Sequence, residues 1–124
     1  PLINWTNEDE ISEIARDQDL TVTWQSQDPA NEYVMIMGSS DSSDFGITTG
    51  FICSAPAEDG SFTVSATVLS SMVANPQWTF EGLPTGALFL GSAPRGHLTV
   101  LEAPGIDIGY FHYGSWAVKN VDFR

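Results

Sequence analysis

The segment at positions 20–37, LTVTWQSQDPANEYVMIM, constrains the fold more than any other part of the chain. Its first part alternates apolar and polar residues, and this period of two predicts a strand that brings Trp24 to the interior. Turn-forming residues follow at positions 25–31. Positions 33–37 are then apolar without alternation, which is typical of a central strand covered on both sides. The segment therefore predicts two strands of a layered β-structure.

The remaining chain continues this pattern in short apolar runs, separated by turn residues at spacings of roughly 8–12 residues. We expect about eight or nine short antiparallel strands and at most one or two helical turns, which together favour an all-β sandwich. The 124 residues are enough for one domain with its own core. We therefore predict a single β-sandwich domain over 1–124, in which 1–19 is an acidic N-terminal segment.

The acidic segment allows two interpretations between positions 7 and 15. Asn7 followed by Glu10 has the form of a helix N-cap with a glutamate at its third position, which predicts one or two helical turns. An extended segment anchored by Ile11 and Ile14 fits equally well, and the strand-like remainder of the chain slightly favours it.

Two further local predictions concern the middle of the chain. Asp59-Gly60 lies between the strand-like runs 47–54 and 61–65, and this dipeptide is typical of a β-hairpin turn. The run 66–72 is expected to form a single helical turn that crosses between sheets.

The final expected strand carries two apolar pairs of opposite parity. Trp116 and Val118 share one parity, and Val121 and Phe123 share the other. If both pairs face the core, one residue must be inserted between them, so we expect a β-bulge near 119–120.

The charge of the chain limits its partners. Sixteen acids against four bases give a net charge of −12. Such a surface repels phosphate backbones and anionic membranes, so we expect no nucleic-acid binding and no membrane insertion. Mutual repulsion favours solubility, which is the preferred interpretation, with a cation or a basic partner as the alternative. No apolar run approaches the roughly 20 residues that a membrane-spanning helix needs.

The residues that could carry catalysis or hold zinc form no recognisable motif. Cys53 is the only cysteine and lies in an apolar run, where a small buried hydrophobe is the expected role. His97 and His112 lie in expected strands, and their spacing from Cys53 matches no zinc site. No nucleophile elbow occurs in the sequence. We therefore expect no enzyme and no cofactor.

Calcium is the better metal hypothesis, because hard cations bind clustered carboxylates on loops. Asp41 and Asp44 lie in a polar loop, and Glu32 or Asp28 is a candidate further ligand. The spacing is not that of an EF-hand, so a solvated polar turn is the favoured interpretation.

Aromatic side chains are the weak candidates for binding. They are Tyr110, Phe111, Tyr113 and Trp116. Tyr110, Phe111 and Tyr113 place rings on both faces of one expected strand, so at least one ring is expected outside the central core. Such a ring can pack within the domain, bury against a protein partner or stack on a sugar.

Several segments resemble an immunoglobulin-like domain found near the C-termini of large, predicted secreted proteins of acidobacteria and similar environmental bacteria. They are LTVTW, YVMIMGSS, GFICSAP, GSFTVSATVLSSM and the last strand, which ends in FR. The resemblance implies an immunoglobulin-like sandwich in which 20–24 and 33–37 are the B and C strands. It also implies a bacterial extracellular or cell-surface location and a non-enzymatic role, and it carries over no functional residues.

These observations lead to two hypotheses for function. The first is a structural or interaction module whose partner is a protein, such as an identical subunit bound by strand addition through the terminal strands into a larger assembly or filament. The second is an accessory carbohydrate-binding module. The chain begins Pro1-Leu2 without an initiator Met, so we expect a processed chain or a piece of a longer one.

Overall fold

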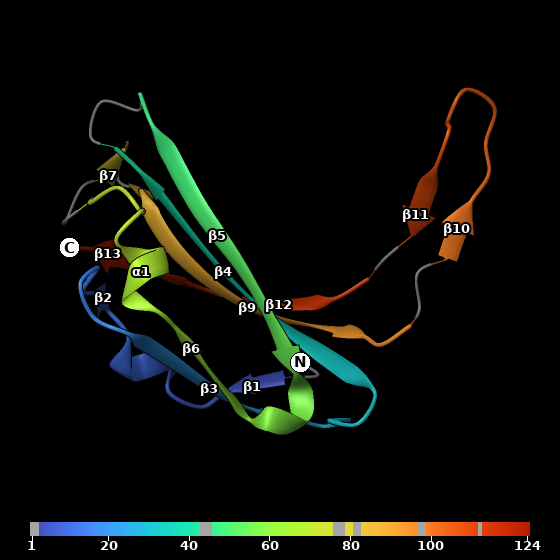
Figure 1. Cartoon of the computed structure of the whole chain (residues 1–124), viewed down its shortest axis with the longest axis horizontal. Coiled ribbons are helices and arrows are strands. Elements are labelled where there is room, and N and C mark those ends of the chain that lie inside the picture. The colour runs from blue at the N-terminus through green and yellow to red at the C-terminus, as the bar shows by residue number, and fades with distance from the viewer. Residues whose placement is uncertain (1–2, 43–45, 76–78, 81–82, 97–98, 112) are drawn as a thin grey trace.

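Two antiparallel β-sheets pack face to face and form the body of the molecule (Figure 1). The computed structural model describes residues 3–42, 46–75, 79–80, 83–96, 99–111 and 113–124. One sheet has the strand order β1-β3-β6, with β1 (Ile3–Trp5), β3 (Leu20–Ser26) and β6 (Ser61–Val64). The other has the order β12-β9-β4-β5, with β12 (Ser115–Asn120), β9 (Gly86–Pro94), β4 (Glu32–Asp41) and β5 (Thr48–Pro56). The predicted all-β sandwich is confirmed.

The strand order is immunoglobulin-like. In chain order, β1, β3 and β6 occupy the positions of strands A, B and E, while β4, β5, β9 and β12 occupy those of C, C′, F and G. The two strands of the opening sequence segment, β3 and β4, therefore do not pair with each other. They lie in opposite sheets and face each other across the core, as B and C strands do.

Short elements complete the described chain. The helical ones are η1 (Glu8–Glu10), η2 (Ala57–Asp59) and α1 (Ala66–Leu69). The short strands are β2 (Glu13–Ile14), β7 (Thr79–Phe80), β8 (Leu83–Pro84), β10 (Thr99–Leu101), β11 (Gly109–Phe111) and β13 (Asp122–Phe123). β7 pairs with β8, β10 pairs with β11, and β13 runs parallel to β2.

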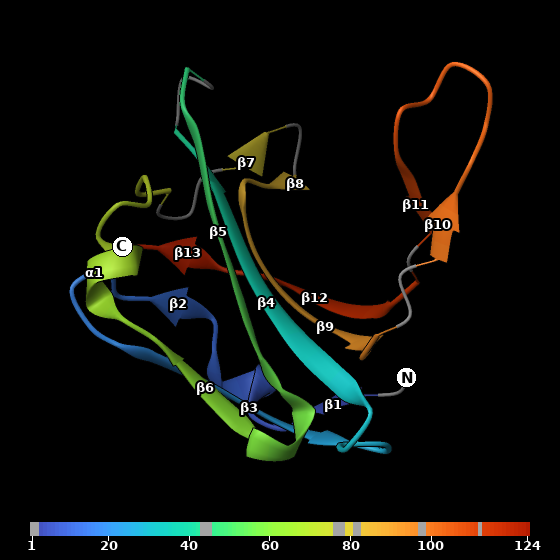
Figure 2. The same cartoon turned by 45° about the vertical axis from the view of Figure 1, so that its right-hand side comes forward.

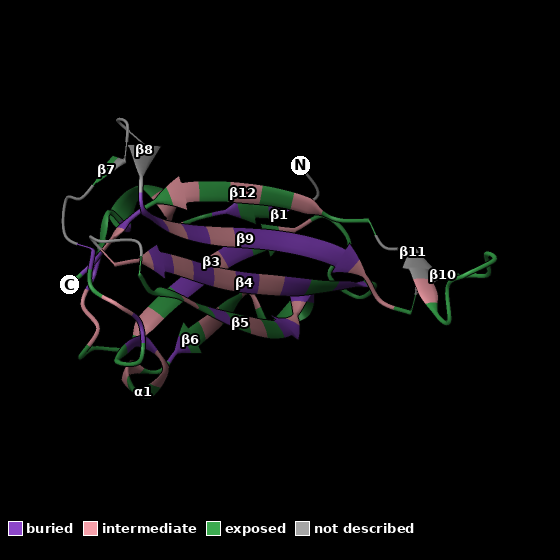
Figure 3. Ribbon diagram, turned by 90° about the horizontal axis from the view of Figure 1, so that it is seen from above, coloured by how far each residue is buried: buried purple, intermediate pink, exposed green. Residues whose placement is uncertain are grey.

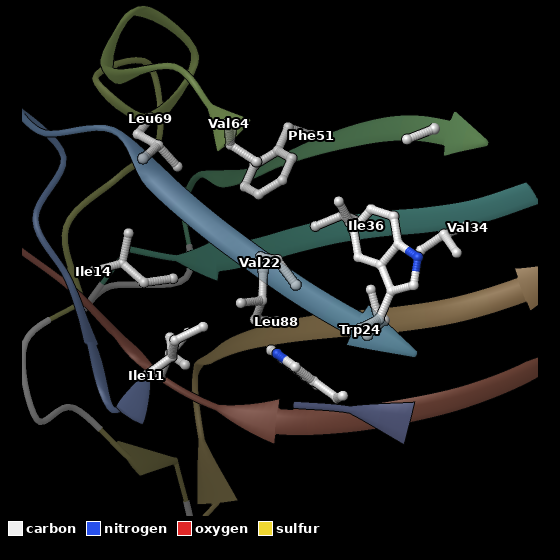
Figure 4. Close-up of a cluster of buried hydrophobic side chains, with 14 of the residues drawn as sticks. Ile11, Ile14, Val22, Trp24, Val34, Ile36, Phe51, Val64, Leu69 and Leu88 are labelled. Atoms are coloured by element: carbon white, nitrogen blue, oxygen red, sulfur yellow. The ribbon is translucent and has the colours of Figure 1, made fainter. Parts of the chain in front are cut away.

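The core lies between the two sheets and is made by the inward residues of each strand. Figure 4 shows its side chains, among them Val22 and Trp24 from β3 and Val34 and Ile36 from β4. Trp24 is buried, as its alternation predicted, and its indole Nε1 donates a hydrogen bond of 2.9 Å to the carbonyl oxygen of Ala57. This bond satisfies the one polar group that the ring brings into the core.

The acidic segment contains both a helical turn and an extended strand, the two alternatives that its sequence allowed. One 3₁₀ turn, η1, is followed by the extended β2, whose Ile14 is buried. Asn7 precedes η1 but its side chain does not cap it. Its Oδ1 accepts hydrogen bonds from the Thr23 amide (3.0 Å) and from Trp5 Nε1 (3.1 Å). The residue therefore ties the segment to β3 rather than starting a longer helix.

The hairpin predicted at Asp59-Gly60 is wrong. Gly60 has the positive φ (68°) that such a turn requires, but it follows η2, and the chain crosses there from one sheet to the other. β6 consequently pairs with β3 and not with β5. The helical turn predicted after it is confirmed, because α1 occupies Ala66–Leu69.

The β-bulge predicted near 119–120 is also wrong. The alternation of exposed and inward residues continues without a slip from β12 into β13. Val121 and Phe123 are buried, whereas Trp116 and Val118 point to the outside of the sandwich. The prediction failed because it placed both apolar pairs in the core.

A buried polar contact holds the last strand. Asn75 is only 2% exposed, and its Oδ1 accepts a 2.7 Å hydrogen bond from the amide of Phe123. The backbone amide of Asn75 donates to the carbonyl oxygen of Phe123 (3.0 Å), and its side-chain Nδ2 donates to Thr85 Oγ1 (3.3 Å). Together these bonds fix β13 against the body of the sandwich.

Candidate functional site

The side of the four-stranded sheet that faces away from the core carries apolar residues on all four strands. Figure 3 colours these strands by burial, and exposed residues alternate with less exposed ones along β12. Strand register places Val118 opposite Phe89, Phe89 opposite Met37, and Met37 opposite Ile52. These four side chains form one row across all four strands. We call the whole surface the outer face; its apolar members are Tyr33, Met35, Met37, Ile52, Phe89, Trp116 and Val118.

Trp116 lies flat on the sheet beside this row. It stands opposite Gly91 of β9, and a Cβ atom at Gly91 would collide with the Trp116 ring. The glycine therefore lets the indole pack directly on the β9 backbone. The ring is still 42% exposed, which leaves part of it open to solvent. Met35 stands opposite Gly91 from the other side, so the ring and the thioether flank the same glycine.

Most of the outer face has no covering layer among the residues that the structure describes. Ile52 is 73% exposed and Val118 is 53% exposed, while Met35 and Met37 are half-buried. The two-sided apolar run at 33–37 predicted a strand covered on both sides. β4 is the central strand that was predicted, since it lies between β9 and β5, but only its inner side is covered. The sequence pattern of a doubly covered strand thus belongs to β4, whose outward side the described part of the chain leaves partly open.

Charged groups stay at the ends of the outer face. Over the described outward positions of the four strands, Asp41 at the end of β4 is the single charged residue. At the opposite end, the Arg95 guanidinium lies 4.7 Å from the ring centre of Tyr33 and contacts Glu58 Oε1 at 3.4 Å. The face therefore has an apolar centre between two polar rims.

A shallow groove runs along one part of this surface. It has a volume of about 520 Å³ and is lined mainly by Met37, Phe51, Ile52 and Phe89. Backbone of Gly38 and Gly50 forms its floor where large side chains are missing. The groove is open to solvent and holds no charged group among its lining residues, so it suits an apolar side chain of a partner.

A second apolar surface belongs to the hairpin of β10 and β11, which we call the arm (residues 99–111). Figures 1 and 2 show the arm standing away from the sandwich, beyond the ends of β9 and β12. Its apolar side chains Val100, Leu101, Ile106 and Ile108 are 49–65% exposed. The main contacts of β10 and β11 are with each other. The arm therefore displays apolar residues that the body of the protein does not cover.

The aromatic candidates from the sequence fall into two groups. Tyr113 and Trp116 are exposed, at 55% and 42%, so both are available to a partner. Tyr110 and Phe111 belong to β11, but their side chains lie outside the described part of the structure. Sequence reasoning missed Ile52 and Val118, although the opposite parities within the last strand contained the signal for Val118.

The calcium candidates are not gathered by the described structure. Asp41 Oδ1 accepts a 2.6 Å hydrogen bond from Thr48, and Asp44 lies outside the described residues. Glu32 lies at the other end of the ten-residue β4, and Asp28 accepts hydrogen bonds from Asn31 beside it. Within the described chain, no group of three or more His, Cys, Asp or Glu residues is arranged to hold a metal ion.

The surroundings of the Cys53 thiol disfavour its reactivity. Cys53 points inward from β5 and packs against the core, and burial raises the pKa of its thiol. A raised pKa disfavours the nucleophilic thiolate. His97 and His112 lie outside the described residues.

No protein-family model, curated protein or solved structure matches the chain. The resemblance to the domain of secreted acidobacterial proteins therefore stays a prediction. Over the described residues, the structure contains no helix with the length and apolar character needed to cross a membrane.

Proposed function

We propose that the protein is a non-catalytic structural or interaction module that binds a protein partner through its outer face. The observation that carries this proposal is the uncovered apolar row from Val118 to Ile52 across four strands. Apolar patches larger than a few hundred Å² are rare on soluble monomers, and they mark interaction surfaces.

The composition of the outer face supports a protein partner. Protein interfaces have an apolar centre rich in aromatic residues and methionine, surrounded by a polar rim in which arginine is common. The outer face combines Trp116, Phe89 and two methionines at its centre with Arg95 and Asp41 at its rims. The chain has a net charge of −12, but the centre of this face carries no charged side chain. The acidic residues that repel other acidic molecules therefore lie elsewhere on the surface.

The place of this module is proposed to be the exterior or the surface of a bacterial cell. The resemblance to secreted bacterial proteins supports this location, as does an acidic surface that favours solubility. Exchange of terminal strands between subunits stays a prediction. β1 and β13 pair with β3 and β2 of their own chain, so such an exchange would have to replace existing pairs.

The proposal is tested with an apolar fluorescent probe, bis-ANS, at low protein concentration. We expect the probe to bind the folded chain and the variant Ile52→Ser/Val118→Ser to bind it several-fold less. Ile47→Ser is the matched control, because Ile47 is 56% exposed and precedes β5 outside the outer face. Equal probe binding by all three proteins would show that the outer face is not a binding surface.

A carbohydrate partner is the second candidate, and the flat position of Trp116 favours it. An indole that lies on a sheet with its ring partly open can stack on a sugar ring. Pull-down with a panel of insoluble polysaccharides tests this alternative. Trp116→Ala should abolish retention while Val118→Ala retains it; a wild-type chain that binds no polysaccharide in the panel excludes the alternative.

A further inference from the structure

We propose that the occupant of the outer face is a second copy of this chain, which places its arm there, and that the contact is reciprocal. In this dimer the arm of each copy packs its apolar side chains against the outer face of the other. The proposal rests on the proposed function, because it names the partner that the outer face binds.

Both surfaces of this contact are exposed within a single chain. Val100 and Ile108 on the arm are more than half exposed, and so are Ile52 and Val118 on the outer face. The arm rises on the side of the sandwich where the outer face lies, but it stands beyond the ends of the strands and apart from the face (Figures 1 and 2). Neither surface therefore covers the other in its own chain.

The area available fits a stable dimer. The exposed large side chains of the two surfaces and of the segment between them are Tyr33, Ile52, Trp116, Val118, Val100, Leu101, Ile106, Ile108 and Tyr113. Successive strand residues point to opposite faces, so Leu101 leaves the arm on the side away from Val100 and is not counted. A large side chain has a surface of roughly 200 Å², so the other eight residues, each about half exposed, offer on the order of 800 Å². A standard interface buries about 800 Å² from each partner.

The two surfaces lie on the same chain, which allows a reciprocal contact as well as a head-to-tail one, and only the reciprocal contact covers every surface within two subunits. A twofold axis lets one copy give its arm and receive the other arm at the same time, so both surfaces of both copies are covered. Such an isologous contact closes on itself and ends at two subunits. A face-to-face contact alone would leave the apolar residues of both arms in water.

Charge supports a second copy over a basic partner. The outward positions of the four strands carry no charge except Asp41, and the charged residues of the arm are Glu102 and Asp107 in its loop. The outer face therefore offers no acidic cluster that would attract a basic protein. Two chains of net charge −12 repel each other, so the dimer is expected to tighten as salt rises, whereas a basic partner would bind less tightly.

Sedimentation equilibrium of the chain at 0.05 and 0.5 M salt tests the proposal. We expect a dimer that dissociates at low concentration and is tighter at the higher salt. The face variant Ile52→Ser/Val118→Ser and the arm variant Val100→Ser/Ile108→Ser should each weaken dimerisation about 100-fold, because every substitution occurs twice in the contact. Ile47→Ser is the control, and urea unfolding verifies that each variant folds.

Mixing the two variants gives the decisive measurement. The arm variant keeps an intact outer face and the face variant keeps an intact arm, so a mixture restores one of the two contacts. Association in the mixture, but in neither variant alone, supports the proposal. A wild-type monomer at both salt concentrations overturns it.

The variants also separate this inference from the proposed function. If only the face variant loses the dimer, the outer face binds a second copy without the arm; the arm contact is then wrong and the proposed function stands. If only the arm variant loses it, arms pair with arms and the reciprocal contact is wrong. If neither variant loses a dimer that the wild type forms, the outer face is not its interface and both proposals fail for this partner.

Discussion

Replacement of Asn75 by alanine is expected to destabilise the sandwich strongly. The side chain is buried, and its Oδ1 is the acceptor for the Phe123 amide at 2.7 Å. Without it, this amide stays buried without that acceptor, which costs about 1–3 kcal/mol. The substitution also removes the hydrogen bond to Thr85 and leaves a small cavity, so the expected loss in the free energy of unfolding is roughly 2–4 kcal/mol. This is a large part of the roughly 5–15 kcal/mol that stabilises a typical domain.

Urea unfolding followed by tryptophan fluorescence measures this loss. With a slope of about 2 kcal/mol per molar urea, the midpoint should fall by roughly 1–2 M. Asn31→Ala is the matched control, because Asn31 is exposed and its side chain donates hydrogen bonds to Asp28 in a turn. Its midpoint should change by less than about 0.3 M. An Asn75→Ala midpoint within 0.3 M of the wild type would refute the role assigned to this residue.

Three further predictions concern the core. Trp24→Phe removes the hydrogen bond to the Ala57 carbonyl and should cost about 1–3 kcal/mol in urea unfolding. Gly38→Ala places a Cβ against the Phe51 ring and should cost about 1–3 kcal/mol, visible as a lower melting temperature. Burial raises the pKa of the Cys53 thiol, so its contribution to stability is present below the pKa of the unfolded thiol and is lost as pH rises through the folded pKa. At pH 8, a disulfide reagent should therefore label Cys53 more slowly in the folded protein than in the protein unfolded by urea.

The sequence predicted those features that depend on one strand and its own burial pattern. The alternation at 20–24 placed Trp24 in the core because one covered face leaves a period of two. The unbroken apolar run at 33–37 identified the central strand β4 for a similar reason. Such a run, however, does not show whether the residues that cover the second side of the strand belong to the same chain. For β4, the partly open outward side could therefore be found only from the structure.

Features that depend on the relation between strands were predicted poorly. Asp59-Gly60 correctly indicated a positive φ at Gly60, but a turn conformation does not determine which sheet the next strand joins. For the last strand, parity showed that Trp116 and Val121 point in opposite directions, and the assumption that both belong to the core produced a bulge that does not exist. The same parity, taken without that assumption, would have placed Trp116 on the outer face.

The parallel pairing of β13 with β2 affects how the chain folds. Phe123 pairs with Ile14 across more than 100 residues, and closing a loop of that length costs roughly 4 kcal/mol in chain entropy. During synthesis, this pair cannot form until residue 123 has left the ribosome, so Ile14 lacks its strand partner until then. Distant contacts of this kind slow folding into the range of milliseconds to seconds. The folding rate should therefore depend on the meeting of these two segments more than on the hairpins between them.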